Sequence, residues 1–446
     1  MIRRLESECS GSCASLLVDG GDLFQGTPAS NLAFGRPVVT YYNALGYAAA
    51  AVGNHEFDWG QDTLRARMKD AGFAILSANV RDTAGRALPW IRPDTMVVRG
   101  GVRIGIIGLS TVETPRTTRT INVANLRFLD PVDVVNERAR SLRARGAEMV
   151  IVLAHAGSAC AATCTGEMAD LAMRVGEPID AIVGGHTHTA MTGVVRGVNI
   201  QRAFSSGRSV AVTDLPVDPA MRAGVATRNL FVTTDSIAPE PQVEAIVRAA
   251  LAPVQGLVRR PVATVAEDLL RHGPQHALGN LIADAQRAAA GTNVAVMNNG
   301  GIRADLRAGP ATYGSFFEIE PFANLLVRMT VRGTDLRAYF ERLMGGRAPN
   351  VHISGAAVRY DPTQPPGSRL VEATVAGSPI DDTRTYTVSL NDFMVTGGDG
   401  LELARPALKV EELGIVDLDA LLEFVGRMPG NVVRADAAPR IVAVPK

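Results

Sequence analysis

The chain contains 446 residues, of which 46% are apolar and 20% are charged, with 45 basic against 45 acidic side chains. That length corresponds to two or three domains with cores of ordinary size, and the composition excludes the disordered and fibrous classes. A net charge of zero gives no electrostatic basis for binding a nucleic-acid polymer or an anionic membrane surface. No apolar run reaches the roughly 18 residues that a membrane span requires. The first twenty residues do not have the pattern of a signal peptide. We therefore expect a soluble globular protein.

Short apolar runs alternate with helical stretches in the first half of the chain. The runs, each bounded by Gly or Asp, are SLLVDGGD (15–22), AAVGNHEFD (50–58), FAILSANV (73–80), RIGIIGLS (103–110), MVIVLAHAG (149–157) and AIVGGHTHT (181–189). Amphipathic segments such as 131–149 follow several of them. This alternation predicts a layered α/β domain over 1–236 whose motifs lie in the loops just after the strands.

A second unit is expected from residue 258 to residue 446. Turn residues interrupt the pattern around 218–240, and a helix is then predicted over 241–257 with Pro241 near its first turn. Beyond it, a predicted helix (278–291) and predicted strands (294–301, 325–333 and 385–392) are mixed. We expect the linker 237–257 to hold the domain boundary and a hinge.

Polar side chains with metal-binding chemistry gather at the strand ends of the first half. Four of the seven histidines lie there, together with Asp22 and Asn54, and these histidines are His55, His155, His186 and His188. A dinuclear site needs oxygen ligands plus imidazoles, with one carboxylate bridging two ions. We expect Asp22 to bridge, Asn54, His155 and His186 to complete one ion, and His188 to reach the other. If GGHTHT is extended, His186 and His188 point the same way.

The four cysteines form two close pairs, Cys9/Cys13 and Cys160/Cys164. Reduced cysteines, a four-thiol zinc site and two local disulfides are all compatible with this spacing. The disulfides, which would indicate an oxidising compartment, are the interpretation that we favour.

The motifs GDLFQG, GNHEFD, the AHAG histidine and GGHTH, in that order, resemble the calcineurin-like metallophosphoesterases, and GNHEFDWG is most similar to the bacterial 5′-nucleotidase and UDP-sugar hydrolase branch. The resemblance implies a four-layer β-sandwich flanked by helices, with two divalent ions (Mn²⁺, Zn²⁺, Co²⁺ or Fe²⁺) held by Asp22, Asn54, His155, His186 and His188. It also implies that His55 is catalytic rather than a ligand and that Asp58 orients it. A carboxylate beside an imidazole fixes its tautomer and favours its charged form, so this pair makes sense on physical grounds as well.

One family motif has no counterpart in the chain. The family opens with Asp-x-His on its first strand, and no Asp-x-His precedes Asp22 here. We therefore expect the phosphoesterase domain to be incomplete at its N-terminus, because of a fragment or a misassigned start rather than a one-metal variant. On that expectation the first ion lacks the two ligands of Asp-x-His. The missing start would also hide any signal peptide.

Candidate substrate-binding residues lie in the second half. NNGGIR contains Asn298 and Arg303, EPF contains Phe322, and DFMVTGGDG contains Phe393 and Asp399. Taken alone, the phenylalanines are as compatible with a core as with a base sandwich, and Gly300-Gly301 with a tight turn. These motifs resemble the C-terminal domain of 5′-nucleotidases, a mixed α/β fold. The resemblance implies that Phe322 and Phe393 stack the base, that Asp399 holds the ribose, and that Asn298 and Arg303 lie near the phosphate or sugar. Asn280 and Asp284 of GNLIADA are expected to serve the fold.

These features together predict a two-domain, metal-dependent hydrolase that releases phosphate from nucleoside 5′-monophosphates. Activity on 2′,3′-cyclic nucleotides, 3′-nucleotides or UDP-sugars is the alternative within the family. Hydrolysis of sulfur–sulfur bonds is a more distant one, and the phenylalanine pair speaks against it. A nucleotide-binding protein without catalysis is the alternative from another class. The resemblance also implies a periplasmic or extracellular location, whereas the oligomeric state has no signal in the sequence.

Overall fold

The computed structural model describes residues 1–9, 13–222, 225, 227–233, 237–346 and 348–444. The chain divides into two compact units. Unit 1 comprises Met1–Gln25 and Ala33–Ala250, and unit 2 comprises Gly26–Leu32 and Leu251–Lys446. Among the described residues, no helix is long and apolar enough to cross a membrane.

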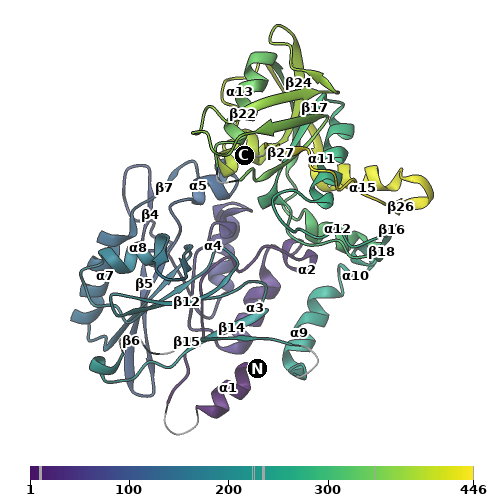
Figure 1. Ribbon diagram of the computed structural model, residues 1–446. Helices are drawn as coiled ribbons and strands as arrows, with labels where there is room; N and C mark the ends of the chain where they lie inside the picture. Colours follow the sequence, from purple (N-terminus) through teal and green to yellow (C-terminus); the bar gives the residue numbers. More distant parts are fainter. Residues whose placement is uncertain (10–12, 223–224, 226, 234–236, 347, 445–446) are drawn as a thin grey trace. The chain divides into compact units, whose positions relative to one another are not determined.

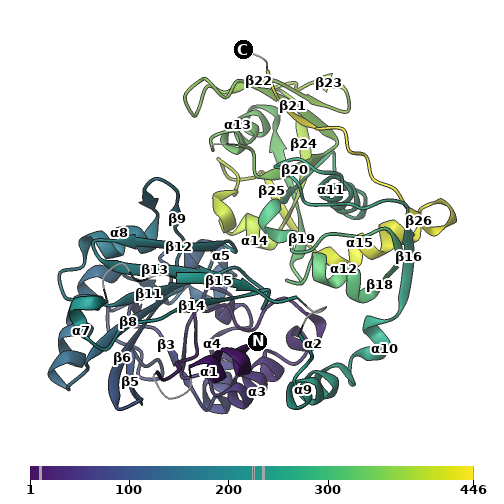
Figure 2. The same ribbon diagram turned by 60° about the horizontal axis from the view of Figure 1, so that its bottom comes forward.

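Two sheets form the centre of unit 1 (Figures 1 and 2). The smaller sheet has the order β1-β2-β3 and is parallel; its strands are β1 (Val18–Asp19), β2 (Ala49–Ala51) and β3 (Ala74–Leu76). The larger has the order β12-β13-β11-β8-β6-β5, in which β6, β8, β11 and β13 run parallel. Its strands are β5 (Asp94–Arg99), β6 (Val102–Leu109), β8 (Met149–Ala154), β11 (Ala181–Gly184), β12 (Ala190–Val195) and β13 (Val198–Ala203).

Apolar side chains on both faces of each sheet produce four layers. Alanines of β2 and Leu76 pack on isoleucines of β6 and β8, which closes the space between the two sheets. The outer face of the larger sheet carries α7 (Pro131–Ala144) and α8 (Glu167–Arg174). The outer face of the smaller sheet carries α3 (Arg36–Leu45) and α4 (Gln61–Asp70). This α/β/β/α order is the predicted layered fold, and continuous apolar runs are what parallel strands covered on both faces require.

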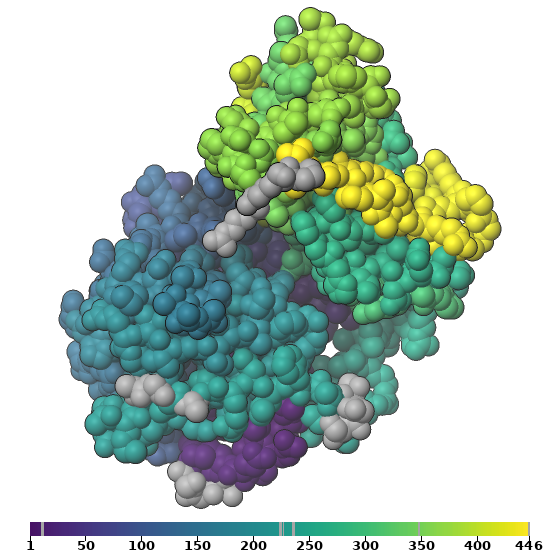
Figure 3. Space-filling model, viewed as in Figure 1, coloured from purple at the N-terminus to yellow at the C-terminus, as the bar shows by residue number. Residues whose placement is uncertain are grey.

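The remaining elements of unit 1 lie outside the two central sheets and the four helices that cover them. The helix α1 (Ile2–Glu8) buries none of its residues, and Figure 3 shows it in purple on the outside of unit 1. The others are η1 (His55–Phe57), β4 (Val80–Asp82), α5 (Thr114–Thr117), α6 (Thr120–Val123), β7 (Leu126–Phe128), β9 (Ala159–Cys160), β10 (Cys164–Thr165), β14 (Ser209–Thr213), η2 (Pro219–Met221), β15 (Thr227–Phe231) and α9 (Pro241–Leu251).

Unit 2 is a mixed α/β unit. Its main sheet has the order β20-β17-β24-β19-β25, and two smaller sheets have the orders β18-β16-β26 and β23-β22-β21-β27. The strands are β16 (Pro261–Val265), β17 (Val294–Asn298), β18 (Gly309–Thr312), β19 (Leu325–Arg332), β20 (Val351–Ser354), β21 (Ala356–Tyr360), β22 (Leu370–Val375), β23 (Ser378–Pro379), β24 (Thr385–Asn391), β25 (Lys409–Val416), β26 (Val432–Val433) and β27 (Ile441–Ala443). The helical elements are α2 (Pro28–Asn31), α10 (Gln255–Val258), α11 (Ala277–Ala290), η3 (Asn299–Gly301), α12 (Tyr313–Ile319), α13 (Gly333–Leu343), α14 (Asp392–Val395), η4 (Gly398–Gly400), α15 (Asp417–Gly426) and η5 (Pro429–Asn431).

Two local predictions are wrong. The single helix expected over 241–257 is broken into α9 and α10, because Pro253 lacks the N–H that a continuous helix would need. The GGHTHT segment is not extended: β11 ends at Gly184, and both His186 (φ 70°) and His188 (φ 51°) adopt left-handed backbone. The alternation of an extended strand therefore does not orient these two imidazoles.

The cysteines form two disulfides, Cys9–Cys13 and Cys160–Cys164. The second joins β9 to β10, which pair in an antiparallel hairpin. This agrees with the interpretation favoured from the sequence, and the four thiols do not form one zinc site.

Candidate functional site

The carboxyl ends of β1, β2, β8 and β11 bring the predicted polar residues of unit 1 together. Asp22 follows β1, Asn54 follows β2, His155 follows β8 directly, and His186 follows β11. Parallel strands end at the same edge of their sheet, and the packing of the two sheets on each other brings both edges to one place.

Four of these side chains converge within hydrogen-bonding distance. Nε2 of His155 lies 3.1 Å from Oδ2 of Asp22 and 3.0 Å from Oδ1 of Asn54. The same Asn54 oxygen lies 3.1 Å from Nδ1 of His186. Nδ2 of Asn54 donates to the carbonyl of Thr117, which fixes the amide with its oxygen toward the two imidazoles.

Charge is concentrated in this cluster. Asp22 and His155 form a buried pair: burial alone favours the neutral acid, but the charges of His155 and His55 hold the pKa of Asp22 well below its usual range. Conversely, burial is the largest single influence on His155 and lowers its pKa, but the charge and hydrogen bond of Asp22, together with the charge of Glu56 and the Gly20 carbonyl, raise that pKa to about 9. The site thus stabilises both an anionic oxygen and a positive charge beside it, which is the electrostatic setting of a cation site.

The cluster fits a divalent metal ion. Ligand atoms of Asp22, His155 and His186 all lie within 4.8 Å of one another, and the Asn54 oxygen faces both imidazoles. A carboxylate, an amide oxygen and two imidazoles are a donor set that Zn²⁺, Mn²⁺ and Fe²⁺ accept. His188 lies outside this group of mutually close ligand atoms, so its role as a ligand of a second ion stays a prediction.

Left-handed backbone marks three of the predicted ligands. Asp22 has φ 62°, in addition to His186 and His188 above. Residues with a Cβ rarely adopt this backbone conformation, because it costs about 1–3 kcal/mol per residue. It persists only where surrounding contacts impose it. The strain therefore lies in the segments that aim the ligands.

His55 and Asp58 form the predicted pair beside the cluster. Nδ1 of His55 lies 2.8 Å from Oδ2 of Asp58, and both side chains are largely buried. Asp58 also accepts hydrogen bonds from Gln25 and from the Thr118 hydroxyl. The backbone N–H of His55 donates to Oδ1 of Asp22, so the pair is attached directly to the cluster.

Sequence reasoning missed two carboxylates. Glu56, 1% exposed, accepts the backbone N–H groups of Asp22, Leu23 and Gly53, so that one carboxylate holds the turns after β1 and β2. Glu113 lies 3.4 Å from Nε2 of His186. A glutamate buried among the apolar residues of a strand-end motif is a signal that could have identified Glu56, whereas Glu113 lies in an ordinary polar loop.

The five residues predicted to bind substrate are connected within unit 2. Nδ2 of Asn298 donates to Oδ2 of Asp399, and both surround Gly300, where an added Cβ would lie 2.8 Å from that oxygen. Arg303 donates to the Gly300 carbonyl, and its guanidinium lies 5.5 Å from the ring centroid of Phe322.

Phe393 completes this group. Its ring lies against Gly398, where an added Cβ would approach to 2.5 Å, and the next residue, Asp399, has left-handed backbone (φ 54°). Asn280 and Asp284 serve the fold as expected: Asn280 donates to the carbonyls of Asp436 and Ala438, and Asp284 pairs with Arg440.

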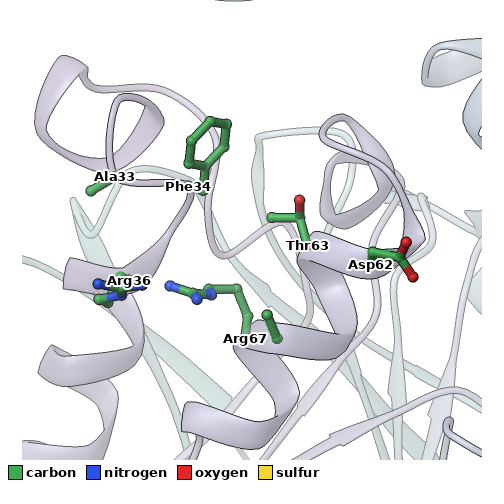
Figure 4. A pocket seen from close by; sticks show the side chains of 7 residues that line it. Ala33, Phe34, Arg36, Asp62, Thr63 and Arg67 are labelled. Carbon is green, nitrogen blue, oxygen red and sulfur yellow. The ribbon is translucent and has the colours of Figure 1, made fainter.

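A hollow of about 310 Å³ lies elsewhere on unit 1, between α3 and α4 (Figure 4). Figure 4 shows the Arg67 side chain extending from α4 toward Arg36 of α3. Nη2 of Arg67 pairs with Asp70, and its other two nitrogens are buried without a hydrogen-bond partner. None of the predicted site residues lines this hollow.

Each of the two units contains a segment that matches a known protein family. Residues 2–190 match the family described as calcineurin-like phosphoesterase, and residues 261–405 match the 5′-nucleotidase, C-terminal domain. The chain is 30% identical over 434 residues to "Endonuclease YhcR" of Bacillus subtilis (strain 168), which covers 92% of the chain but only 35% of that protein.

Two further proteins are similar to this chain over most of its length and over most of their own. The chain is 28% identical over 470 residues to a snake venom 5′-nucleotidase of Naja atra, which covers 93% of the chain and 87% of that enzyme. A crystal structure of a 5′-nucleotidase precursor from Thermus thermophilus matches with a TM-score of 0.85 and 29% identity over 98% of this chain and 91% of that one. The resemblance seen in the motifs is confirmed: the chain belongs to the calcineurin-like phosphoesterases that carry a 5′-nucleotidase C-terminal domain.

Proposed function

We propose that this protein is a metal-dependent phosphohydrolase that releases phosphate from nucleoside 5′-monophosphates. The observation that carries the proposal is the convergence of Asp22, Asn54, His155 and His186 beside the His55–Asp58 pair. The chain matches two proteins named 5′-nucleotidase over most of their length, and this similarity supports the substrate class.

Asp22, Asn54, His155 and His186 would hold one divalent ion, and His188 would contribute to a second, with Asp22 between them. The ions, when bound, supply Lewis-acid stabilisation of the phosphoryl oxygens and an activated water. Their identity among Mn²⁺, Zn²⁺, Co²⁺ and Fe²⁺ follows from supply as much as from ligand type. Glu56 holds the turns that aim Asp22 and Asn54.

His55 acts on the leaving group. Because Asp58 accepts from Nδ1, the imidazole is held in one orientation, with Nε2 as the nitrogen that exchanges the proton. Protonation of the departing 5′-oxygen from Nε2 prevents an alkoxide from forming.

Unit 2 binds the nucleoside. Phe322 and Phe393 stack the base, Asp399 accepts hydrogen bonds from the ribose hydroxyls, and Arg303 and Asn298 contact the sugar or phosphate. The bonds among Asn298, Asp399 and Gly300 preorganise these groups. We place the hinge between substrate loading and catalysis in the linker 237–257, which contains α9.

An oxidising compartment, periplasmic or extracellular, is the proposed location. Both cysteine pairs are disulfides, and local disulfides persist where glutathione does not reduce them.

A nucleotide panel tests the proposal. Phosphate release is measured with Mn²⁺ from 5′-AMP, 3′-AMP, 2′,3′-cyclic AMP and a UDP-sugar, before and after chelation. We expect 5′-AMP to be the best substrate, with activity lost on chelation. Preference for a cyclic or 3′-nucleotide would reassign the substrate, and nucleotide binding without turnover of any of them would overturn the enzymatic assignment.

A further inference from the structure

Arg202 is the largest fully buried side chain of the described residues and is 1% exposed. It lies on β13, where it is paired with Gly184 of β11 on one side and with Met191 of β12 on the other. Arginine is almost never fully buried unless paired with an acid. No ion pair between Arg202 and a carboxylate is found in the part of the chain that the structure describes.

The Arg202 guanidinium instead binds two stretches of main chain. Nε donates to the carbonyl of Thr189 (2.7 Å), and Nη2 donates to the carbonyl of Ser158 (2.9 Å) and to the Thr189 hydroxyl. Nη1 is buried without a hydrogen-bond partner. A buried cation with an unsatisfied nitrogen is destabilising, and an apolar side chain of similar volume would serve packing alone better. The bonds to these two carbonyls are therefore what this side chain provides.

Both carbonyls belong to segments that carry predicted metal ligands. Ser158 lies three residues after His155, and Thr189 follows His188 directly and lies three residues after His186. The segment from His186 to Thr189 contains both left-handed histidines, so its conformation has to be imposed from outside. The guanidinium is rigid and planar, so its donors set the spacing of the two segments.

We infer that Arg202 is a positioning residue that fixes the distance between the His155 and His186 segments and so sets the affinity of the site for its metal ion. The inference rests on the proposed metal site. It assigns to one buried cation the task of holding two ligand-bearing loops in register, a role that partners of ligands commonly fill.

A matched control lies at the opposite end of β8 and β11, the two strands that precede the His155 and His186 segments. Arg222 is 5% exposed, and its guanidinium donates to the carbonyl of Glu148, which precedes β8, and to Asp180, which precedes β11. Since β8 separates Glu148 from His155 by seven residues, these positions are about 20 Å apart. Loss of Arg222 should damage the fold without disturbing the ligands.

The test compares Mn²⁺ affinity, by calorimetric titration of metal-free protein, in wild type, R202M, R202K and R222M. We expect R202M to bind Mn²⁺ about 10- to 100-fold more weakly than wild type. R202K, whose single ammonium can reach one segment only, should fall between them. R222M should stay within about twofold of wild type, because distant sites act independently. Excess Mn²⁺ should restore phosphate release by R202M, which it cannot do for a merely misfolded site.

Each outcome is distinguishable. R202M or R202K binding Mn²⁺ as tightly as wild type would overturn the inference and leave the metal site intact. Equal weakening in R202M and R222M would reduce Arg202 to a structural residue. If wild type binds Zn²⁺, Co²⁺ or Fe²⁺ but not Mn²⁺, the same comparison is made with that ion; failure of wild type to bind any of the four would overturn the proposed function and this inference with it. If R202M does not fold, R202K decides alone.

Discussion

Substitution of Asp58 by asparagine separates the charge of this residue from its geometry. Oδ2 of Asp58 faces Nδ1 of His55 (2.8 Å) and accepts from Nε2 of Gln25 (2.9 Å), whereas Oδ1 accepts from the Thr118 hydroxyl (2.8 Å). Gln25 can only donate at this position, but a hydroxyl can donate or accept. An asparagine therefore satisfies all three partners by placing its oxygen toward His55 and its amide toward Thr118.

The His55 tautomer should thus survive in Asp58→Asn, and only the charge is lost. A hydrogen bond to a charged group is worth about 1.5–3 kcal/mol and a neutral one about 0.5–1.5 kcal/mol, so the bond should weaken by about 1–1.5 kcal/mol and kcat/KM for 5′-AMP should fall about 5- to 10-fold. Asp58→Ala also removes the orientation and should cost more. Removal of the acid itself, in His55→Ala, should cost about 10²- to 10⁴-fold.

The assay compares 5′-AMP with p-nitrophenyl phosphate under saturating Mn²⁺. p-Nitrophenolate leaves without protonation, so the losses in His55→Ala and Asp58→Asn should largely disappear with that substrate. Metal affinity of each variant, measured separately, controls for damage to the cluster. Equal losses with both substrates, at unchanged metal affinity, would refute the assignment of His55 as the acid that protonates the leaving group.

Three further predictions concern residues away from this pair. Glu56→Gln should lower unfolding stability by about 2–3 kcal/mol, seen in urea denaturation, because an amide cannot accept all three N–H groups; unchanged stability would mean that the turns hold themselves. Phe393→Ala should raise KM for 5′-AMP about tenfold or more, as for a lost base stack, while KM for p-nitrophenyl phosphate stays constant; parallel changes would remove Phe393 from the base site. Burial, with the charges of His276 and Arg440, lowers the pKa of His352 to about 3. The unfolded chain therefore binds the extra proton as pH falls below about 6.5, and stability should fall with pH by up to about 1.4 kcal/mol per unit down to about pH 3. His352→Phe should flatten this dependence between pH 7 and pH 5, and an unchanged slope would exclude His352 as its source.

The strand ends of unit 1 could be predicted from the sequence because continuous apolar runs, each followed by Gly, Asp or His, have few other structures available. RIGIIGLS and MVIVLAHAG became β6 and β8, and this placed His155 at the site. The same apolar pattern does not predict the backbone conformation of the residues that follow a strand. His186 and His188 adopt left-handed conformations, so the extended GGHTHT on which a common direction of the two side chains depended does not form.

Residues that act through long-range contacts escaped prediction for a related reason. Arg202 is one of 42 arginines scattered along the chain, and its bonds to Ser158 and Thr189 depend on the order of β11, β12 and β13. Glu113 approaches His186 from a loop 73 residues away. In unit 2, residue identity alone could not distinguish a core role from a base-stacking role for Phe322 and Phe393. The similarity to the family motifs favoured base stacking.

The most direct test of metal-dependent catalysis at this site measures phosphate release from 5′-AMP by metal-stripped protein, before and after addition of Mn²⁺, in wild type and in His186→Ala. We expect no turnover without metal, turnover by wild type once Mn²⁺ is added, and little or none by the variant at the same Mn²⁺ concentration. Turnover that survives chelation, or a variant as active and as tightly metal-bound as wild type, would contradict this expectation.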